Sequence, residues 1–384
     1  MKTSSVKHSN RSSILSQIMA HQFISRKQVA SVLGLSPAAV SNIVDELIRE
    51  NLVVEGVAGE ASSKGGRRPI SLTINPDAGR ILSVVFRLRN PQVAVCDMVG
   101  RILDSRSYEE QEFEGTRQMA QTLFQDMRQL IDEAGGSSKF VGAGLSVPGI
   151  VQNGMILNSP ELGLVNSGLA AELEEAIGIP VYIDKDVYMN ALGENWKGAG
   201  QKYSNFVTVT IGTGIGSAMI IDNKVYRGAG GMAGEIGYLS TSMDALGQGP
   251  FQYTDFGYFE RRASVNALRE EMRMGFHQIA QRCLAGEERV LEKLFFQTDQ
   301  LCLGLGSLIS LMNPEAVILT GAYGLVADLV RERIVRNLEY LTPIRCDISF
   351  SHLGSQMIVY GCVGTVLQKK YDITFLQKFS KEGE

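Results

Sequence analysis

The sequence has little of what cross-links a small secreted domain or holds a metal. Its 384 residues include only four histidines, one tryptophan and five cysteines. The cysteines are odd in number, widely scattered and never paired as CxxC; they are Cys96, Cys283, Cys302, Cys346 and Cys362. This spacing argues against a disulfide framework and against a cysteine zinc site. We therefore expect the reducing environment of the cytoplasm.

Long uncharged apolar runs are also missing. No apolar run reaches the roughly 18 residues of a spanning helix, and no secretory apolar segment opens the chain. We therefore expect no membrane contact. With 44% hydrophobic and 20% charged residues, the composition is that of a globular protein. A length of 384 residues suits two or three domains.

A net positive charge is found only at the start of the chain. Residues 1–72 contain nine Lys and Arg against five Asp and Glu, a net charge of +4, which leaves −8 for the remainder. A basic N-terminal segment on an acidic body indicates that the segment, and not the body, meets a polyanion.

Three short helices are predicted in this basic segment, within residues 10–22, 25–34 and 36–51. Ser25 and Gln28 form a capping box for the second helix, and Gly34 ends it. Ser36 caps the third helix and Pro37 occupies its first position. Helices joined through this glycine turn predict a helix-turn-helix, and residues 52–74 read as two strands joined by a flexible wing.

This geometry places the start of the third helix in the major groove of double-stranded DNA. Its outward side chains are small and polar, which permits close approach and contact with base edges. The wing adds cations suited to the minor groove or the neighbouring phosphates. A helical docking module without DNA is the alternative. The predicted DNA-binding residues are Ser25, Arg26, Ser36, Pro37, Ala38, Ala39, Ser41, Asn42, Lys64, Arg67 and Arg68.

From about residue 76, strands and helices alternate in two sets, and each set opens on a three-stranded meander. The first set begins with residues 80–108, and the second begins with FVTVTIGTGIGSAMIIDNKVY at residues 206–226. Two such α/β halves predict a two-lobed body with ligands collected between the lobes.

Several motifs together resemble one family. They are VTVTIGTGIGSAMI, GAGGMAGEIG, IPVYIDKDVYMNALGE, NPEAVILTGA and the GRRP arm after the wing. The chain is similar to the ROK family (repressors, open reading frames and sugar kinases), in the branch with an N-terminal winged helix. The resemblance implies an actin-like, ribonuclease H-like body, frequent homo-oligomers and carbohydrate ligands. It divides the chain into a winged helix at 1–75, a first lobe at 76–186 with a C-terminal helix at about 370–384, and a second lobe and dimerisation region at 187–369.

The same resemblance indicates that kinase chemistry has been lost. The second phosphate turn is kept as Gly212, Thr213, Gly214 and Gly216, which we expect to persist as scaffold. The first turn, an acid followed by Gly-Gly-Thr in the family, is replaced by FRLRNPQV, with Arg87, Arg89 and Pro91. Asp186 stands at the position of the catalytic base, but Lys185 and Tyr188 replace the two neighbouring asparagines. An ammonium beside Asp186 lowers its basicity and favours an ion pair with it, so we expect no catalytic residue.

The family's structural zinc is also expected to be absent, and we expect no cofactor. Its histidine position is Tyr238, and Phe251, Tyr253 and Tyr258 occupy the cysteine positions. Aromatic rings cannot form a tetrahedral zinc site but can bury apolar area in its place.

The resulting prediction is a transcriptional regulator, a repressor in the commoner mode of the family. It would bind DNA as a homodimer or homotetramer and respond to a sugar or sugar derivative between the lobes. The predicted effector residues are Lys185, Asp186, Glu235, Tyr238 and Glu260. Lys185 could attract an anionic sugar, or it could neutralise Asp186, Glu235 or Glu260 and close the pocket. The alternatives are control by a protein partner and an ATP-dependent sugar kinase with a DNA-binding appendage.

Overall fold

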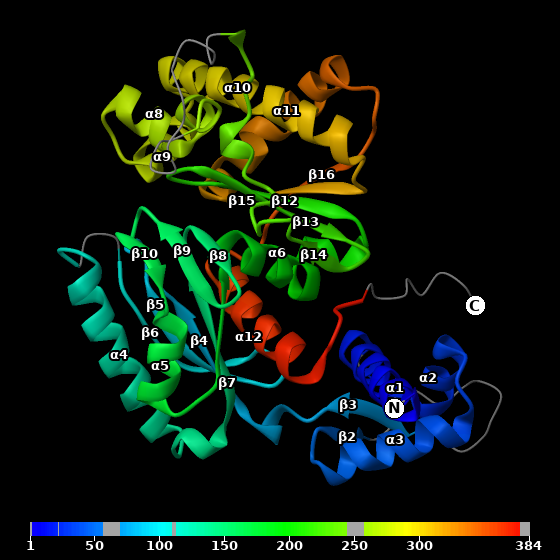
Figure 1. The fold of residues 1–384 in the computed structure, drawn as a ribbon. Helices are drawn as coiled ribbons and strands as arrows, with labels where there is room; N and C mark the ends of the chain where they lie inside the picture. Colours follow the sequence, from blue (N-terminus) through cyan, green and yellow to red (C-terminus); the bar gives the residue numbers. More distant parts are fainter. Residues whose placement is uncertain (1, 22, 57–69, 110–112, 244–256, 377–384) are drawn as a thin grey trace.

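The computed structural model describes residues 2–21, 23–56, 70–109, 113–243 and 257–376. A winged helix at the N-terminus lies beside a body of two α/β lobes, and helices α6 (Asp186–Lys197) and α12 (Gln356–Tyr371) lie between the lobes (Figure 1).

The winged helix contains the three predicted helices and a small sheet of order β1-β3-β2. The first helix begins earlier than predicted, at Lys2. The elements are α1 (Lys2–Ala20), β1 (Ile24–Ser25), α2 (Arg26–Leu33), α3 (Pro37–Arg49), β2 (Val53–Gly56) and β3 (Ser71–Ile74). The predicted caps are present: Ser25 and Gln28 form the capping box, Gly34 is in the left-handed conformation, and Ser36 caps α3.

The first lobe is built on a five-stranded sheet of order β11-β7-β4-β5-β6. Its strands are β4 (Arg80–Val85), β5 (Gln92–Asp97), β6 (Ile102–Ser107), β7 (Phe140–Val147) and β11 (Val181–Lys185). The first three form the predicted antiparallel meander, and β7 and β11 add parallel strands. Helices α4 (Thr116–Glu133) and α5 (Leu169–Ile177) cover the outer face, where Leu123, Leu130 and Leu173 enter the core.

The second lobe repeats this order with β14-β13-β12-β15-β16. Its strands are β12 (Phe206–Ile211), β13 (Ile215–Ile221), β14 (Lys224–Tyr226), β15 (Ala316–Gly321) and β16 (Asp347–Phe350). Its helices are α7 (Glu260–Ala263), α8 (Val265–Met272), α9 (Phe276–Leu284), α10 (Glu288–Met312) and α11 (Ala327–Leu341). The repeated strand order confirms the two matching halves expected from the sequence. A separate sheet of β8 (Ile150–Gln152), β9 (Met155–Ser159) and β10 (Leu164–Ser167) was not predicted.

The C-terminal helix lies earlier in the chain than predicted. It spans Gln356–Tyr371 and packs on α6 and on β7 and β4 of the first lobe, so it belongs to that lobe and not to the second. The helix ends where Asp372 adopts the left-handed conformation (φ 55°), which cannot continue a right-handed helix. The expectation of a helix over about 370–384 is therefore wrong for residues 372–376, and residues 377–384 lie outside the described part.

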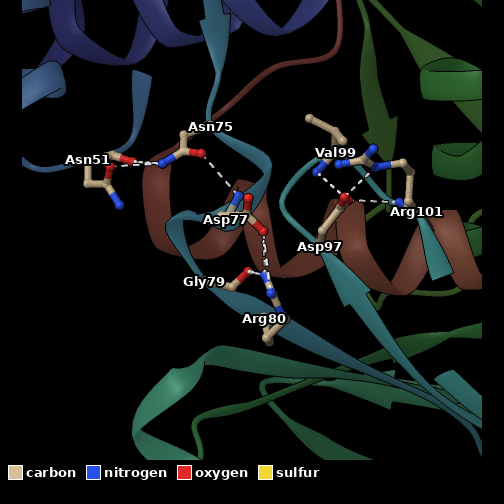
Figure 2. A network of polar contacts seen from close by, with 8 residues as sticks. All are labelled: Asn51, Asn75, Asp77, Gly79, Arg80, Asp97, Val99 and Arg101. Carbon is tan, nitrogen blue, oxygen red and sulfur yellow. Dashed lines mark hydrogen bonds and ion pairs between the residues drawn. The ribbon is translucent and has the colours of Figure 1, made fainter. Parts of the chain in front are cut away.

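The winged helix and the first lobe share one apolar core. Buried residues of α1 and α3, such as Ile14 and Leu47, belong to the same cluster as Trp196 of α6 and Val363 of α12. The segment that connects the two domains, near residue 75, is also held by hydrogen bonds (Figure 2). The Asn75 side chain donates to the backbone oxygen of Asn51 at 2.9 Å and accepts from the Asp77 amide at 3.1 Å. The boundary predicted at 75/76 is therefore a stiff joint and not a loose linker.

Candidate DNA-binding surface and interlobe site

The start of α3 is presented to solvent. Ser36, Pro37, Ala38 and Asn42 are exposed, while the opposite face of the helix buries Val40, Ile43, Val44 and Leu47. The Ser36 hydroxyl accepts from the Ala39 amide at 3.2 Å, so its side chain is used to begin the helix. Ala39 and Ser41 are half-buried beside this surface. The helix therefore offers a small, polar first turn of the kind that enters a groove.

Arg26 differs from its predicted role at the DNA surface. Its guanidinium pairs with Asp45 of α3 at 2.7 Å and with Glu55 of β2 at 2.8 Å. These contacts brace α2 against α3 and the wing, and they satisfy the charge that was expected to meet a phosphate. Ser25 is buried and is engaged in the capping box. The other predicted cations, Lys64, Arg67 and Arg68, lie outside the described residues.

The interlobe site gathers at the end of β11, where the chain turns into α6. Lys185 caps α6 and Asp186 is its first residue. The Lys185 side chain is 3% exposed, and its ammonium pairs with Glu235, which stands before the second-lobe 3-10 helix η4 (Ile236–Tyr238). Of the two interpretations of Lys185, the structure supports neutralisation of a carboxylate. The ion pair expected with Asp186 is wrong: the partner is Glu235.

Three residues that sequence reasoning did not assign complete this contact between the lobes. Arg227 forms a two-pronged ion pair with Asp184 of β11, whose side chain is 7% exposed. The Tyr188 hydroxyl donates to the backbone oxygens of Gly231 and Ala233, at 3.1 and 2.9 Å. A signal was present in the sequence, since a carboxylate at the end of an apolar strand needs a buried cation nearby.

Two cations lie within about 5 Å of the Tyr188 ring centroid. The Lys185 ammonium lies 4.9 Å from the ring centroid and the Arg227 guanidinium lies 5.1 Å from it. Burial raises the pKa of Tyr188 to about 12, so its hydroxyl keeps its proton and stays a donor. The loop 227–235 of the second lobe is thus held on β11 of the first lobe by two ion pairs, and on α6 by the hydrogen bonds of this hydroxyl.

Asp186 has no ion pair with a described residue, and its carboxylate accepts from the Val187 amide at 2.8 Å. Removal from water raises the pKa of Asp186, and the charges of Arg87 and Lys185 offset only part of this effect. The lowered basicity predicted from the neighbouring ammonium is therefore wrong, because desolvation outweighs the attraction.

Replacing Asp186 by Asn is expected to raise the free energy of unfolding at pH 8, because the variant no longer keeps a charge away from water there. The folded-state pKa of Asp186 is raised, so the folded protein binds the proton more tightly than the unfolded chain. Stability is then lost as the pH rises from the ordinary carboxyl pKa through the raised one. Thermal unfolding of both proteins at pH 5 and pH 8 measures this pH dependence. The difference in stability between the Asn variant and the wild-type protein is expected to be smaller at pH 5. Greater stability of the wild-type protein at pH 8 would contradict the assignment.

The glycine turn of the opening strands of the second lobe is occupied by a carboxylate of the protein itself. Glu260 accepts from the Ile215 amide at 2.8 Å and from the Gly257 amide at 3.3 Å. A Cβ on Gly214 would stand 1.8 Å from the Glu260 carboxylate oxygen, so the turn needs glycine there to admit Glu260. Burial raises the pKa of Glu260. The Glu260 carboxylate, predicted to be an effector ligand, is thus bonded within the glycine turn itself.

The degenerate first turn shows the same substitution. The Leu88 amide donates to the Glu161 carboxylate at 2.9 Å. Arg87 lies near Asp186, and its Nε is buried with no hydrogen-bond acceptor among the described residues. In both lobes, a backbone amide in the segment predicted to be a phosphate-turn remnant is therefore bonded to a side-chain carboxylate.

Part of the predicted aromatic replacement for zinc is described. Tyr238 is half-buried at the end of η4, and Tyr258 is buried with the Arg262 guanidinium 4.6 Å from its ring centroid. Phe251 and Tyr253 lie outside the described residues. Within the described ranges, no group of three or more His, Cys, Asp or Glu side chains could hold a metal.

Helix α10 is long and apolar enough, by length and composition, to cross a membrane. More than half of its apolar window is buried inside the protein, where Leu294, Leu301 and Leu305 belong to the core of the second lobe. This is the pattern of a core helix.

Comparison with known proteins identifies the two parts of the chain. A ROK family profile matches residues 90–362, and a winged helix-turn-helix DNA-binding profile matches residues 8–54. The chain belongs to the ROK family. The family assignment, the N-terminal winged helix and the sugar-kinase-like body are therefore confirmed.

Two of the similar proteins match over nearly the whole chain. The xylose repressor of Caldicellulosiruptor bescii is 27% identical over 94% of this chain and 96% of its own length. A crystal structure of a ROK family transcriptional regulator, a homologue of the E. coli MLC protein, has a TM-score of 0.80, with 22% identity, 96% coverage of this chain and 97% of its own.

Kinases of the family match the body. The Streptomyces griseus glucokinase, solved with glucose and AMPPNP, has a TM-score of 0.62 and 24% identity, over 75% of this chain and 98% of its own. The relatives that span the winged helix as well as the body favour the predicted regulator over an enzyme.

Proposed function

We propose that this protein is a transcriptional repressor of sugar-utilisation genes, which acts in the cytoplasm and releases its operator when a sugar binds between the lobes. The observation that carries the proposal is the exposed first turn of α3, held by a braced winged helix on a sugar-kinase-like body. The names of the full-length relatives support xylose, or a sugar of similar size, as the effector.

The charges at the lobe junction favour a neutral sugar. Lys185 is paired with Glu235 and Arg227 with Asp184, while Arg87 lies near the Asp186 carboxylate. Lys185 and Arg227 are each paired with a carboxylate, so an anionic sugar would have to separate one of these two ion pairs to bind either cation. Hydroxyl groups of a neutral sugar can instead share the hydrogen-bonding groups of these residues.

A panel of xylose, glucose, glucuronate and xylose phosphate in a thermal-shift experiment tests the effector. Xylose is expected to raise the melting temperature in a concentration-dependent way, and the two anionic sugars are expected to have little effect. A larger shift with the anionic sugars would overturn the choice of a neutral effector.

The competing function is an ATP-dependent sugar kinase. The Glu260 and Glu161 carboxylates accept hydrogen bonds from backbone amides at the two turn positions. Their negative charge would repel a nucleotide phosphate at either turn. We expect no turnover in a coupled ATPase assay with the same sugars. Turnover that Asp186→Asn abolishes would establish the kinase.

The wing offers a test of DNA binding. Replacing Arg67 and Arg68 by Ala is expected to weaken binding to all duplexes by roughly tenfold, because two phosphate contacts are lost irrespective of sequence. The slope of log affinity against log salt concentration is expected to fall by about two. Fluorescence anisotropy over a salt series measures both, and an unchanged slope would remove the wing from the interface.

We further propose that the protein acts as a homodimer formed through the second lobe. Leu311 of α10 is 80% exposed and Tyr340 of α11 is 85% exposed, so both apolar side chains are available to a second subunit. A two-fold dimer would place two α3 helices on two operator half-sites. Light scattering with Tyr340→Asp tests this surface through a loss of dimer.

A further inference from the structure

The segment that follows α12 reaches back to the winged helix. We call residues Asp372–Phe375 the C-terminal strap. The Asp372 backbone oxygen accepts from the Ser12 hydroxyl of α1, and the Thr374 amide donates to the Ser16 hydroxyl at 2.9 Å. Figure 1 shows the chain after α12 passing beside α1. The strap is therefore bonded to a helix of the DNA-binding module.

The other side of the strap is bonded to the last turn of α6. The Asn195 amide donates to the Phe375 backbone oxygen at 3.2 Å, and both side chains are at most 2% exposed. The Trp196 ring stacks on the Phe375 ring with 5.0 Å between centroids and 27° between planes. Ile373 and Phe375 are buried in the core shared by the winged helix and the first lobe.

Helix α6 connects this contact to the lobe junction. Its first residue is Asp186, next to Lys185, and its twelve residues carry the chain about 18 Å to Lys197. The residue before Asn195 is held by the second lobe: Glu194 is fully buried and accepts from the Ser351 hydroxyl beyond β16. The last turn of α6 thus contacts both the second lobe and the strap.

Helices α6 and α12 are packed too closely to slide independently. A Cβ on Gly193 of α6 would stand 2.0 Å from the Met357 oxygen, and one on Gly361 of α12 would stand 1.9 Å from the Met189 oxygen. Contacts of backbone on backbone make the two helices one rigid pair. The strap continues directly from α12, so a movement of this pair must also move the strap.

We propose that the C-terminal strap passes movements of the α6–α12 pair to the winged helix and thereby couples the lobe junction to the spacing of the DNA-reading helices. The joint at Asn51 and Asn75 holds the other edge of the module, so the strap and this joint are the two places where a movement of the body reaches the module. The regulatory part of the inference rests on the proposed function, but the mechanical part does not.

Phe375→Ala tests the mechanical part in the full chain. It removes the stack on Trp196 and leaves the backbone bonds of the strap available. We expect amide hydrogen exchange in α1, around Ser12 and Ser16, to rise about tenfold or more. The emission of Trp196, the sole tryptophan, is expected to shift to the red. The matched control is Phe296→Ala, which removes a ring that is 60% exposed on α10. Unchanged exchange in α1 would overturn the proposal.

A duplex selected by the wild-type protein from a random pool, with xylose as the probe, tests the regulatory part. Xylose is expected to weaken duplex binding by the wild-type protein by roughly tenfold. In Phe375→Ala this ratio is expected to fall toward one, while xylose affinity by calorimetry stays within about twofold. An unchanged ratio would overturn the coupling. If xylose does not affect the wild-type protein, the proposed effector fails, and hydrogen exchange alone decides the role of the strap.

Discussion

Replacing Ala38 by Glu is expected to weaken duplex binding by about 100-fold or more. Ala38 is exposed in the first turn of α3, so the new carboxylate would stand against the phosphates of a bound duplex. Like charges brought together at an interface cost several kcal/mol. A glutamate near a helix N-terminus interacts favourably with the helix dipole, so the fold of the module is expected to be preserved.

The matched control for this change is Ala38→Gln, which adds similar volume without charge. Anisotropy with a selected duplex is expected to show a much smaller loss for Gln than for Glu. Equal losses of affinity for the two variants would show that the effect is steric. Full affinity of the Glu variant would show that α3 does not contact the duplex. Circular dichroism should give the same helix content for both variants.

Replacing Lys185 by Met is expected to lower the free energy of unfolding by about 2 kcal/mol. The change leaves the Glu235 carboxylate without its cation at the lobe junction. Breaking a fully buried pair costs roughly 3–5 kcal/mol, and the 33% exposure of the Glu235 side chain reduces this value. The melting temperature is expected to fall by roughly 2–3 °C, because the entropy of unfolding grows with chain length.

Two further variants show whether the pair itself is responsible. The double variant Lys185→Met with Glu235→Gln is expected to regain part of the loss, because no unpaired charge remains. Lys293→Met breaks the exposed pair with Glu271 and is expected to change stability by less than about 0.5 kcal/mol. Equal losses for Lys185→Met and Lys293→Met would show that the junction pair has no special role.

Local sequence rules predicted the elements well wherever the cause was local. Ser25 with Gln28, Gly34 and Ser36 define α2 and the start of α3 through their own hydrogen bonds and backbone angles. The two meanders followed from β-branched runs separated by turns. The end of α12 was missed because apolar residues continue after it: Ile373 and Phe375 are buried in an extended segment and not on a helix face.

The sequence left three carboxylates open as the partner of Lys185, because the choice among them depends on distant parts of the chain. Lys185 is next to Asp186 in sequence, yet its partner Glu235 lies 50 residues away. The raised pKa of Asp186 likewise reflects burial, which no neighbouring residue reports. Glu260 was expected to face a sugar. Only the folded structure shows that its carboxylate accepts a hydrogen bond from the Ile215 amide.

The core shared by the winged helix and the first lobe limits how such proteins can be recombined. A chimaera that carries this N-terminal module on the body of a relative would replace Ile373, Phe375 and Trp196 beneath α1 with unmatched side chains. A module cut at residue 75 would be transferred without the apolar residues of the body on which it packs. New operator specificities are therefore better built by changing the exposed face of α3 within the intact chain than by exchanging whole domains.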